Sequence, residues 1–184
     1  PAPRNTAPAI LAAVLHLAKT DPDGPVLVAP SDHLVPDAAG FRAAVAAGLP
    51  AAQAGRIVTF GIRPDRAETG YGWLELADAA GAGPMPLTRF VEKPDRARAE
   101  AMLAEGRYLW NAGLFLFTPR AFLAAVEAHA PDLLPPVRAA VEGARADLDF
   151  LRLEEQAWEG APEISVDYAV MERAGNLDVV PYGG

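Results

Sequence analysis

The sequence predicts an α/β fold in which helices cover both faces of a mixed, mostly parallel central sheet. Short apolar runs alternate with helical patterns along the chain, which is typical of sheets built from successive strand–helix–strand units. Several runs are continuously apolar, as in strands that are buried on both faces. The 184 residues, of which 51% are hydrophobic, suffice for one domain with a sizeable core.

The first elements are predicted from capping residues and apolar spacing. Thr6 can cap a first helix, whose first turn tolerates Pro8 because its N–H groups lack intrahelical partners. The apolar positions of this helix recur on one face as far as Leu17. The apolar run 26–29, ended by Pro30, then predicts a first strand that is buried on both faces.

The same two patterns predict the later elements. Helices are expected where apolar residues recur at helical spacing, at 41–53, 95–105, 119–129, 131–143, 147–158 and 165–172. Strands are expected at the apolar runs 56–60, 72–76, 87–92, 114–117 and 177–180. Glycine, proline and aspartate predict a loop at 61–72. Because ligands bind at the carboxyl ends of strands in such sheets, polar residues at those ends are the candidates for a site.

The composition limits the classes of function. The formal net charge of −8 argues against a nucleic-acid-binding surface, which needs clustered lysine and arginine. The chain has no cysteine, which excludes disulfides and thiolate metal sites. The longest apolar run is about half of a bilayer span, and no leader peptide is recognised. A cytoplasmic protein without membrane contact is therefore expected.

Charged residues follow two of the predicted strands. Asp32 comes directly after the run 26–29, where a carboxylate suits Mg²⁺; the alternative is that it caps a turn. Glu92 and Lys93 end another strand. The carboxylate suits sugar hydroxyls and the ammonium suits a phosphate; the alternative is that the two form a surface ion pair. The neighbouring His33 on its own is more typical of a structural histidine.

Three further motifs combine small or polar residues. The turn 68–72 contains Gly72, which lets a ligand approach the backbone closely, although an ordinary hairpin loop has the same pattern. Asn111 offers donors and acceptors to a hydroxylated ligand, or it is a turn asparagine. Ser165 and Asp167 have the pattern of a helix start, with Ser165 as the cap and Asp167 favoured by the helix dipole.

Taken in order, these segments resemble the mannose-1-phosphate guanylyltransferase family over essentially the whole chain. The resemblance is carried by Arg4-Asn5-Thr6-Ala7-Pro8-Ala9, Ala29-Pro30-Ser31-Asp32-His33, Phe60-Gly61-Ile62, Glu68-Thr69-Gly70-Tyr71-Gly72, Phe90-Val91-Glu92-Lys93-Pro94, Tyr108-Leu109-Trp110-Asn111-Ala112-Gly113 and Ser165-Val166-Asp167-Tyr168-Ala169-Val170-Met171-Glu172. The first and last strings favour the guanylyl branch over uridylyl, thymidylyl and adenylyl relatives. Bifunctional members that add a mannose-6-phosphate isomerase domain share these motifs.

The resemblance implies a Rossmann-like nucleotide-diphospho-sugar transferase fold and a set of roles. It places Asn5, Thr6 and Ala7 near guanine and ribose, Tyr71, Gly72, Glu92, Asn111 and Asp167 around the mannose, Lys93 at the sugar phosphate and Asp32 on Mg²⁺. Asp32 and Lys93 are the implied catalytic residues. In the implied reaction, a phosphate oxygen of mannose 1-phosphate attacks the α-phosphorus of GTP, pyrophosphate leaves and GDP-mannose forms.

The resemblance also implies that residues 1–184 are one nucleotidyltransferase domain core, incomplete at both ends. The family's glycine-rich triphosphate loop and its second metal-binding aspartate are not in the sequence, so the chain alone is expected to be inactive. Two alternatives remain open: a non-catalytic sugar-phosphate-binding or regulatory module, and a transferase for another base or hexose 1-phosphate. The expected partners are GTP and mannose 1-phosphate, and a homo-oligomer is compatible with the sequence.

Overall fold

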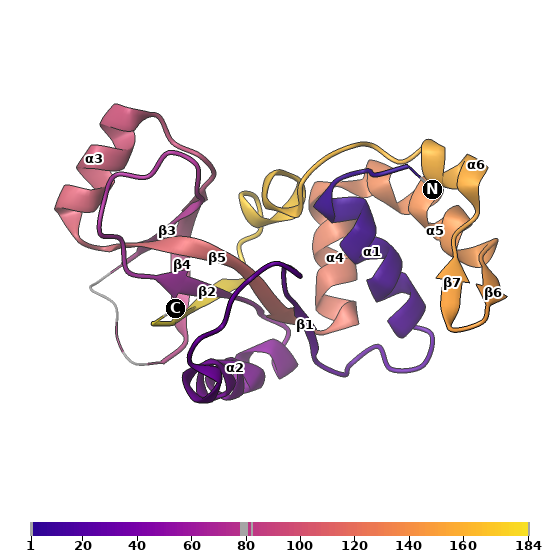
Figure 1. Cartoon of the computed structure of the whole chain (residues 1–184), viewed down its shortest axis with the longest axis horizontal. Coiled ribbons are helices and arrows are strands. Elements are labelled where there is room, and N and C mark those ends of the chain that lie inside the picture. Colours follow the sequence, from indigo (N-terminus) through magenta and orange to yellow (C-terminus); the bar gives the residue numbers. More distant parts are fainter. Residues whose placement is uncertain (1, 78–80, 82, 184) are drawn as a thin grey trace. The chain divides into compact units, whose positions relative to one another are not determined.

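The chain folds into two compact units in a computed structural model that describes residues 2–77, 81 and 83–183 (Figure 1). Unit 1 comprises Pro1–Gly24 and Pro119–Ala174, and unit 2 comprises Pro25–Thr118 and Gly175–Gly184. The grouping of residues 1–184 into one domain stays a prediction. Within the described ranges, no helix has the length and apolarity needed to cross a membrane.

Unit 1 is mostly helical. Its elements are α1 (Thr6–Leu17), α4 (Pro119–His129), the 3₁₀ turn η1 (Pro131–Leu133), α5 (Leu134–Glu142), the strands β6 (Arg145–Asp147) and β7 (Phe150–Arg152), α6 (Glu155–Glu159) and the π-helical turn η2 (Asp167–Met171). Helix α1 packs against α4 and α5. The core of the unit contains fully buried Leu11, Val14, Phe122 and Val137, which recur at helical spacing on their elements.

Two predictions in unit 1 were wrong. Residues 147–158 do not form one helix, because β6 and β7 pair as an antiparallel hairpin and α6 begins only at Glu155. The carboxylate of Glu154 caps α6 by accepting hydrogen bonds from two backbone N–H groups. Thr6 is not the cap of α1 either: the side chain of Asn5 accepts from the Thr6 N–H.

Unit 2 contains a mixed sheet of six strands. They are β1 (Val26–Val28), β2 (Ile57–Ile62), β3 (Trp73–Leu76), β4 (Met85–Val91), β5 (Tyr108–Phe117) and β8 (Leu177–Pro181). Their order is β1-β5-β2-β8-β4-β3, and β3 also pairs with β5. The expected α/β architecture with a mixed sheet is therefore present.

The direction of the strands differs from the expectation. Among the described strands, β2 and β8 form the parallel pair, and the other pairings are antiparallel. A mostly parallel sheet is not confirmed, because the apolar pattern of a strand does not encode its direction. The Rossmann-like classification and the coverage of both faces by helices stay predictions. Strand β1 is also not buried on both faces, since it lies at the sheet edge and Leu27 is 37% exposed.

Two helices pack on this unit. Helix α2 (Ala38–Gln53) starts three residues earlier than predicted, because the Asp37 side chain accepts from the N–H groups of Ala39 and Gly40. Gly48, which weakens the sequence pattern, lets α2 approach the sheet: an added Cβ would lie 3.1 Å from Val58. Helix α3 (Arg96–Glu105) ends at residue 105, as predicted, because the following Gly106 takes the left-handed conformation with φ of 72°.

Candidate functional site

Strands β3, β4 and β5 bring several of the predicted sugar-site residues of unit 2 together. The N–H of Asn111 donates to the carbonyl oxygen of Gly72 at 2.8 Å, and the N–H of Lys93 donates to that of Tyr71 at 3.2 Å. The residue pairs Trp73–Val91 and Trp73–Trp110 continue this arrangement into the strands. The three motifs, distant in sequence, are therefore held side by side by backbone hydrogen bonds.

Gly72 allows the side chain of Glu92 to lie close to the backbone of the neighbouring strand. A Cβ at this position would lie 2.8 Å from Oε2 of Glu92 and 3.0 Å from the Phe90 ring. The absence of a side chain therefore leaves room for the Glu92 carboxylate at its present position. Gly72 was predicted to let a ligand approach the backbone closely. In the structure, the side chain that lies close to it is that of Glu92.

Glu92 and Lys93 form an ion pair in which the two groups have different surroundings. Lys93 Nζ lies 3.4 Å from Glu92 Oε1, and the side chains are 55% and 7% exposed respectively. The φ of Lys93 is 45°, an uncommon conformation for a residue that precedes a proline. Strained backbone of this kind is concentrated at functional sites, which supports the hypothesis that the direction of this lysine matters.

The buried side chain of Thr59 holds the carboxamide of Asn111. Its hydroxyl lies 2.8 Å from Asn111 Oδ1 and 3.2 Å from the carbonyl oxygen of Leu114. The N–H of Gly113 also donates to Asn111 Oδ1, at 3.2 Å. These two donors fix the carboxamide oxygen on the protein side and so determine the orientation of the amide.

Thr59→Val tests this positioning. Valine keeps the shape but removes the hydroxyl, so we expect the free energy of unfolding to fall by about 1 kcal/mol. If the site binds a sugar, its KM should rise by roughly fivefold because the Asn111 amide is less well oriented. Chemical denaturation and initial-rate kinetics measure the two effects, with Thr88→Val on the exposed face of β4 as control. A normal KM in a destabilised variant would contradict the positioning role.

A cavity of about 270 Å³ lies beside these residues in unit 2. Its lining consists of His33, Ile62, Arg66, Tyr71, Trp110, Asn111 and Ala112. The rings of Tyr71 and Trp110 meet edge to face at 5.4 Å, and the guanidinium of Arg66 lies 4.9 Å from the Trp110 ring centre. No role was predicted for Arg66 or Trp110. Trp110 lies within the motif 108–113 that carries the resemblance, and Arg66 lies two residues before the motif 68–72.

Asp32 lies near the same cavity but has few contacts. It is exposed, it makes no hydrogen bond or ion pair with the described residues, and the adjacent His33 lines the cavity. No three acidic or histidine side chains gather into a metal-binding group within the described ranges. One unengaged carboxylate still fits Mg²⁺, which keeps several waters and binds one or two carboxylates plus substrate phosphates. The role of Asp32 as its ligand stays a proposal.

In unit 1, the predicted nucleotide residues lie next to Asp167. The hydroxyl of Thr6 accepts from the N–H of Val166 at 2.9 Å, and the N–H of Ala7 donates to the carbonyl of Ile164 at 3.1 Å. Asn5 has φ of 65° and caps α1, a conformation that asparagine tolerates better than most residues. The side chain of Ala7 is buried, so its contribution to a ligand is limited to the backbone.

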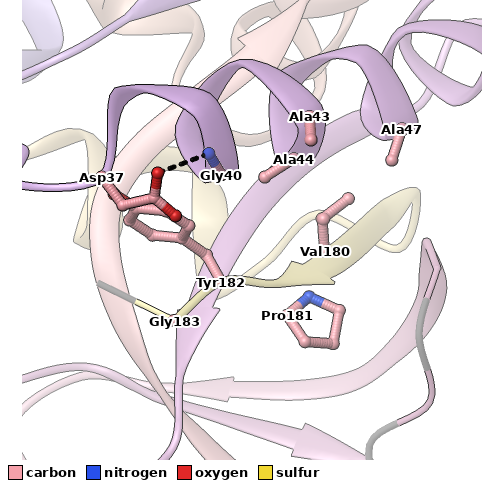
Figure 2. A pocket seen from close by; sticks show the side chains of 9 residues that line it. All are labelled: Asp37, Gly40, Ala43, Ala44, Ala47, Val180, Pro181, Tyr182 and Gly183. Carbon is pink, nitrogen blue, oxygen red and sulfur yellow. Dashed lines mark hydrogen bonds between the residues drawn. The ribbon is translucent and has the colours of Figure 1, made fainter.

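A second cavity of unit 2 contains none of the predicted residues. About 340 Å³ in size, it lies between α2 and the end of β8 (Figure 2). Figure 2 shows small alanine side chains and Gly40 on one wall and Val180, Pro181 and Tyr182 on the other. Its carboxylate, Asp37, already caps α2. The hydroxyl of Tyr182 in its lining is buried without a hydrogen-bond partner among the described residues. The described lining has no basic side chain that could bind a phosphate, so the site around Gly72 and Asn111 is the better candidate.

The α/β fold agrees with what sequence comparison finds. The nucleotidyl transferase family model matches residues 1–161, and the chain belongs to this family. Mannose-1-phosphate guanylyltransferase of Escherichia coli K12 is 45% identical over 98% of this chain and 39% of its own length. Xanthan biosynthesis protein XanB of Xanthomonas campestris is 45% identical over 98% of this chain and 38% of its own length. The chain thus spans under half the length of these curated relatives.

Solved structures give the same result. A Helicobacter pylori protein described as mannose-6-phosphate isomerase superposes with a TM-score of 0.87 at 30% identity, over 97% of this chain and 68% of that one. A Thermus thermophilus protein described as mannose-1-phosphate geranyltransferase gives a TM-score of 0.84 at 36% identity, over 100% of this chain and 51% of that one. The predicted resemblance to mannose-1-phosphate guanylyltransferases is confirmed.

Proposed function

We propose that the protein carrying this chain makes GDP-mannose and pyrophosphate from GTP and mannose 1-phosphate. The observation that supports this most directly is the cluster of Gly72, Glu92, Lys93 and Asn111 on neighbouring strands. The cluster combines a nearly buried carboxylate, an exposed ammonium and an oriented carboxamide. These groups suit the hydroxyls and the phosphate of a sugar phosphate.

In this proposal, the residues of unit 2 hold the sugar phosphate. Glu92 and Asn111 hydrogen-bond to mannose hydroxyls, and Tyr71, 45% exposed, packs its ring against the sugar. Lys93 pairs with the phosphate, whose oxygen attacks the α-phosphorus of GTP. A new P–O bond forms there while the bond to the β-phosphate oxygen breaks, and pyrophosphate leaves. Alignment and charge neutralisation by these side chains lower the barrier.

The nucleotide and the metal complete the proposal. Of the residues in unit 1, Asn5, Thr6 and Ala7 lie against guanine and ribose, and the mannose role of Asp167 stays a prediction. Asp32 would hold Mg²⁺, which when bound neutralises phosphate charge. The Asp32 carboxylate is exposed and makes no hydrogen bond or ion pair with the described residues. Substrate and solvent oxygens could therefore complete the coordination of the metal ion.

The function is tested by measuring pyrophosphate release from a panel of nucleotides and hexose 1-phosphates with the full-length protein. We expect turnover with GTP and mannose 1-phosphate in the presence of Mg²⁺. Turnover with UTP or dTTP but not with GTP would refute the guanylyl assignment. Binding of mannose 1-phosphate without turnover of any nucleotide would identify a non-catalytic module instead.

Glu92→Gln and Lys93→Ala are expected to have different effects. Loss of a charged hydrogen-bond partner costs about 1.5–3 kcal/mol, roughly ten- to a hundredfold in kcat/KM. Glu92→Gln should blur the discrimination among hexose 1-phosphates, whereas Lys93→Ala should weaken all of them alike. Steady-state kinetics with mannose, glucose and galactose 1-phosphates measure this, with Lys19→Ala in unit 1 as control. Equal effects of both substitutions on sugar preference would contradict the division of roles.

A further inference from the structure

Arg66 is fixed in an oriented position at the wall of the 270 Å³ cavity. Its Nε donates to Glu68 Oε2 at 3.3 Å, and its Nη1 donates to Asp65 Oδ1 at 3.0 Å. The guanidinium also lies over the Trp110 ring at 4.9 Å. A hydrogen bond from the Gly70 N–H, together with Arg66, lowers the pKa of Glu68 below its ordinary value. The carboxylates and the ring together fix the plane of the guanidinium.

The third nitrogen of this guanidinium is still available. Nη2 of Arg66 makes no hydrogen bond with the described residues, and the side chain is 55% exposed. Arg66 and His33 are the residues of the described lining that can carry a positive charge. Lys93 is not in that lining and lies beside Glu92. An anion in the cavity would therefore meet Arg66.

The ring beneath Arg66 has an unusual environment. Trp110 is 6% exposed, and its indole N–H is buried without a hydrogen-bond partner among the described residues. The neighbouring Trp73, by contrast, donates its indole N–H to the carbonyl of Glu68 at 2.8 Å. Buried donors of this kind are rare, and each requires an explanation such as a ligand or a functional constraint. The strand pairing Trp110–Ile62 keeps the ring at this wall of the cavity.

We propose that Arg66 binds the phosphate group of the sugar 1-phosphate, with Trp110 as the platform that holds its guanidinium in place. This inference rests on the proposed function and adds a second cation to Lys93. Nη2 can donate to a phosphate oxygen from a fixed guanidinium plane, whereas an ammonium acts as a point charge. The ion pairs of Arg66 are exposed and therefore weak, so they orient the side chain without preventing it from binding an anion.

The test compares Arg66→Gln, Arg66→Lys and the control Arg63→Gln. Arg63 is an exposed arginine of the same segment that makes no ion pair with the described residues. Kinetics give KM for mannose 1-phosphate and kcat, and titration calorimetry gives Kd for mannose 1-phosphate and for mannose. We expect Arg66→Gln to raise KM and Kd for mannose 1-phosphate about ten- to a hundredfold. Arg66→Lys should be intermediate, Arg63→Gln within about twofold, and mannose binding unchanged.

Several outcomes would overturn the inference, and they are distinguishable from failure of the proposed function. If the unmodified protein releases pyrophosphate with no sugar 1-phosphate, both fail. Normal turnover of the unmodified protein with an unchanged KM in Arg66→Gln overturns the role of Arg66 alone. Weaker binding of mannose in both Arg66 variants would show that Arg66 supports the loop rather than the phosphate. If Arg66→Gln unfolds at a lower temperature than the unmodified protein, the KM and Kd of Arg66→Lys for mannose 1-phosphate decide instead.

Discussion

Asp32→Asn in the full-length protein should lower kcat by about a hundredfold or more without changing the free energy of unfolding. The activity loss follows from the proposed metal site, because a neutral amide is a poorer ligand for a hard dication and charge neutralisation at a reacting phosphate contributes several kcal/mol. Stability should hold because Asp32 is exposed and makes no ion pair with the described residues. Kinetics at limiting and saturating Mg²⁺ and a thermal melt measure both.

The matched control is Asp149→Asn, the same chemical change at an exposed aspartate in the β6–β7 turn of unit 1. It should leave kcat and the apparent Mg²⁺ affinity unchanged. Turnover of Asp32→Asn equal to that of the unmodified protein at limiting Mg²⁺ would remove Asp32 from the proposed site. A large loss of stability would show that the carboxylate has a structural role instead.

Gly72→Ala should damage activity more than stability. The new methyl group would lie 2.8 Å from Oε2 of Glu92 and 3.0 Å from the Phe90 ring, so the flexible carboxylate must move while the ring shifts slightly. Displacement of a substrate-positioning group by about 1 Å can cost a hundredfold, and we expect that loss in kcat/KM for mannose 1-phosphate. Overpacking should lower the free energy of unfolding by about 1–3 kcal/mol.

Gly175→Ala is the control for this substitution. An added Cβ at Gly175 meets nothing within 4 Å, and its φ is not in the left-handed region. Kinetics and denaturation should therefore match those of the unmodified protein. If Gly72→Ala lowers stability but keeps kcat/KM, the Glu92 carboxylate does not need its present position, and the proposed sugar site would have to be revised.

Sequence alone predicted the elements that depend on local chemistry. Helix α4 runs over Pro119–His129 as expected, because proline suits the first helical turn. The stop at Gly106 follows from the left-handed conformation that glycine adopts there. The order of motifs was also sufficient to indicate the family, since it required no knowledge of how the motifs meet in space.

Other features depended on contacts between distant residues. The hairpin at 145–152 replaced a predicted helix, since strand pairing overrode local propensity. The antiparallel direction of most strands in unit 2 is likewise a property of pairing and not of any single segment. The apolar pattern of a strand predicts that it is buried, but not the partner against which it lies.

For the site, sequence by itself determined the chemical types, and the tertiary structure decided their arrangement. The sequence supplied Glu92, Lys93 and Asn111 as separate candidates, each with an ordinary alternative. Only the fold joined the backbone N–H groups of Asn111 and Lys93 to the carbonyl oxygens of Gly72 and Tyr71. Only the fold placed the Arg66 guanidinium over the buried indole of Trp110. Such contacts join residues separated by tens of positions, and their geometry is set by strand register, which no local pattern encodes.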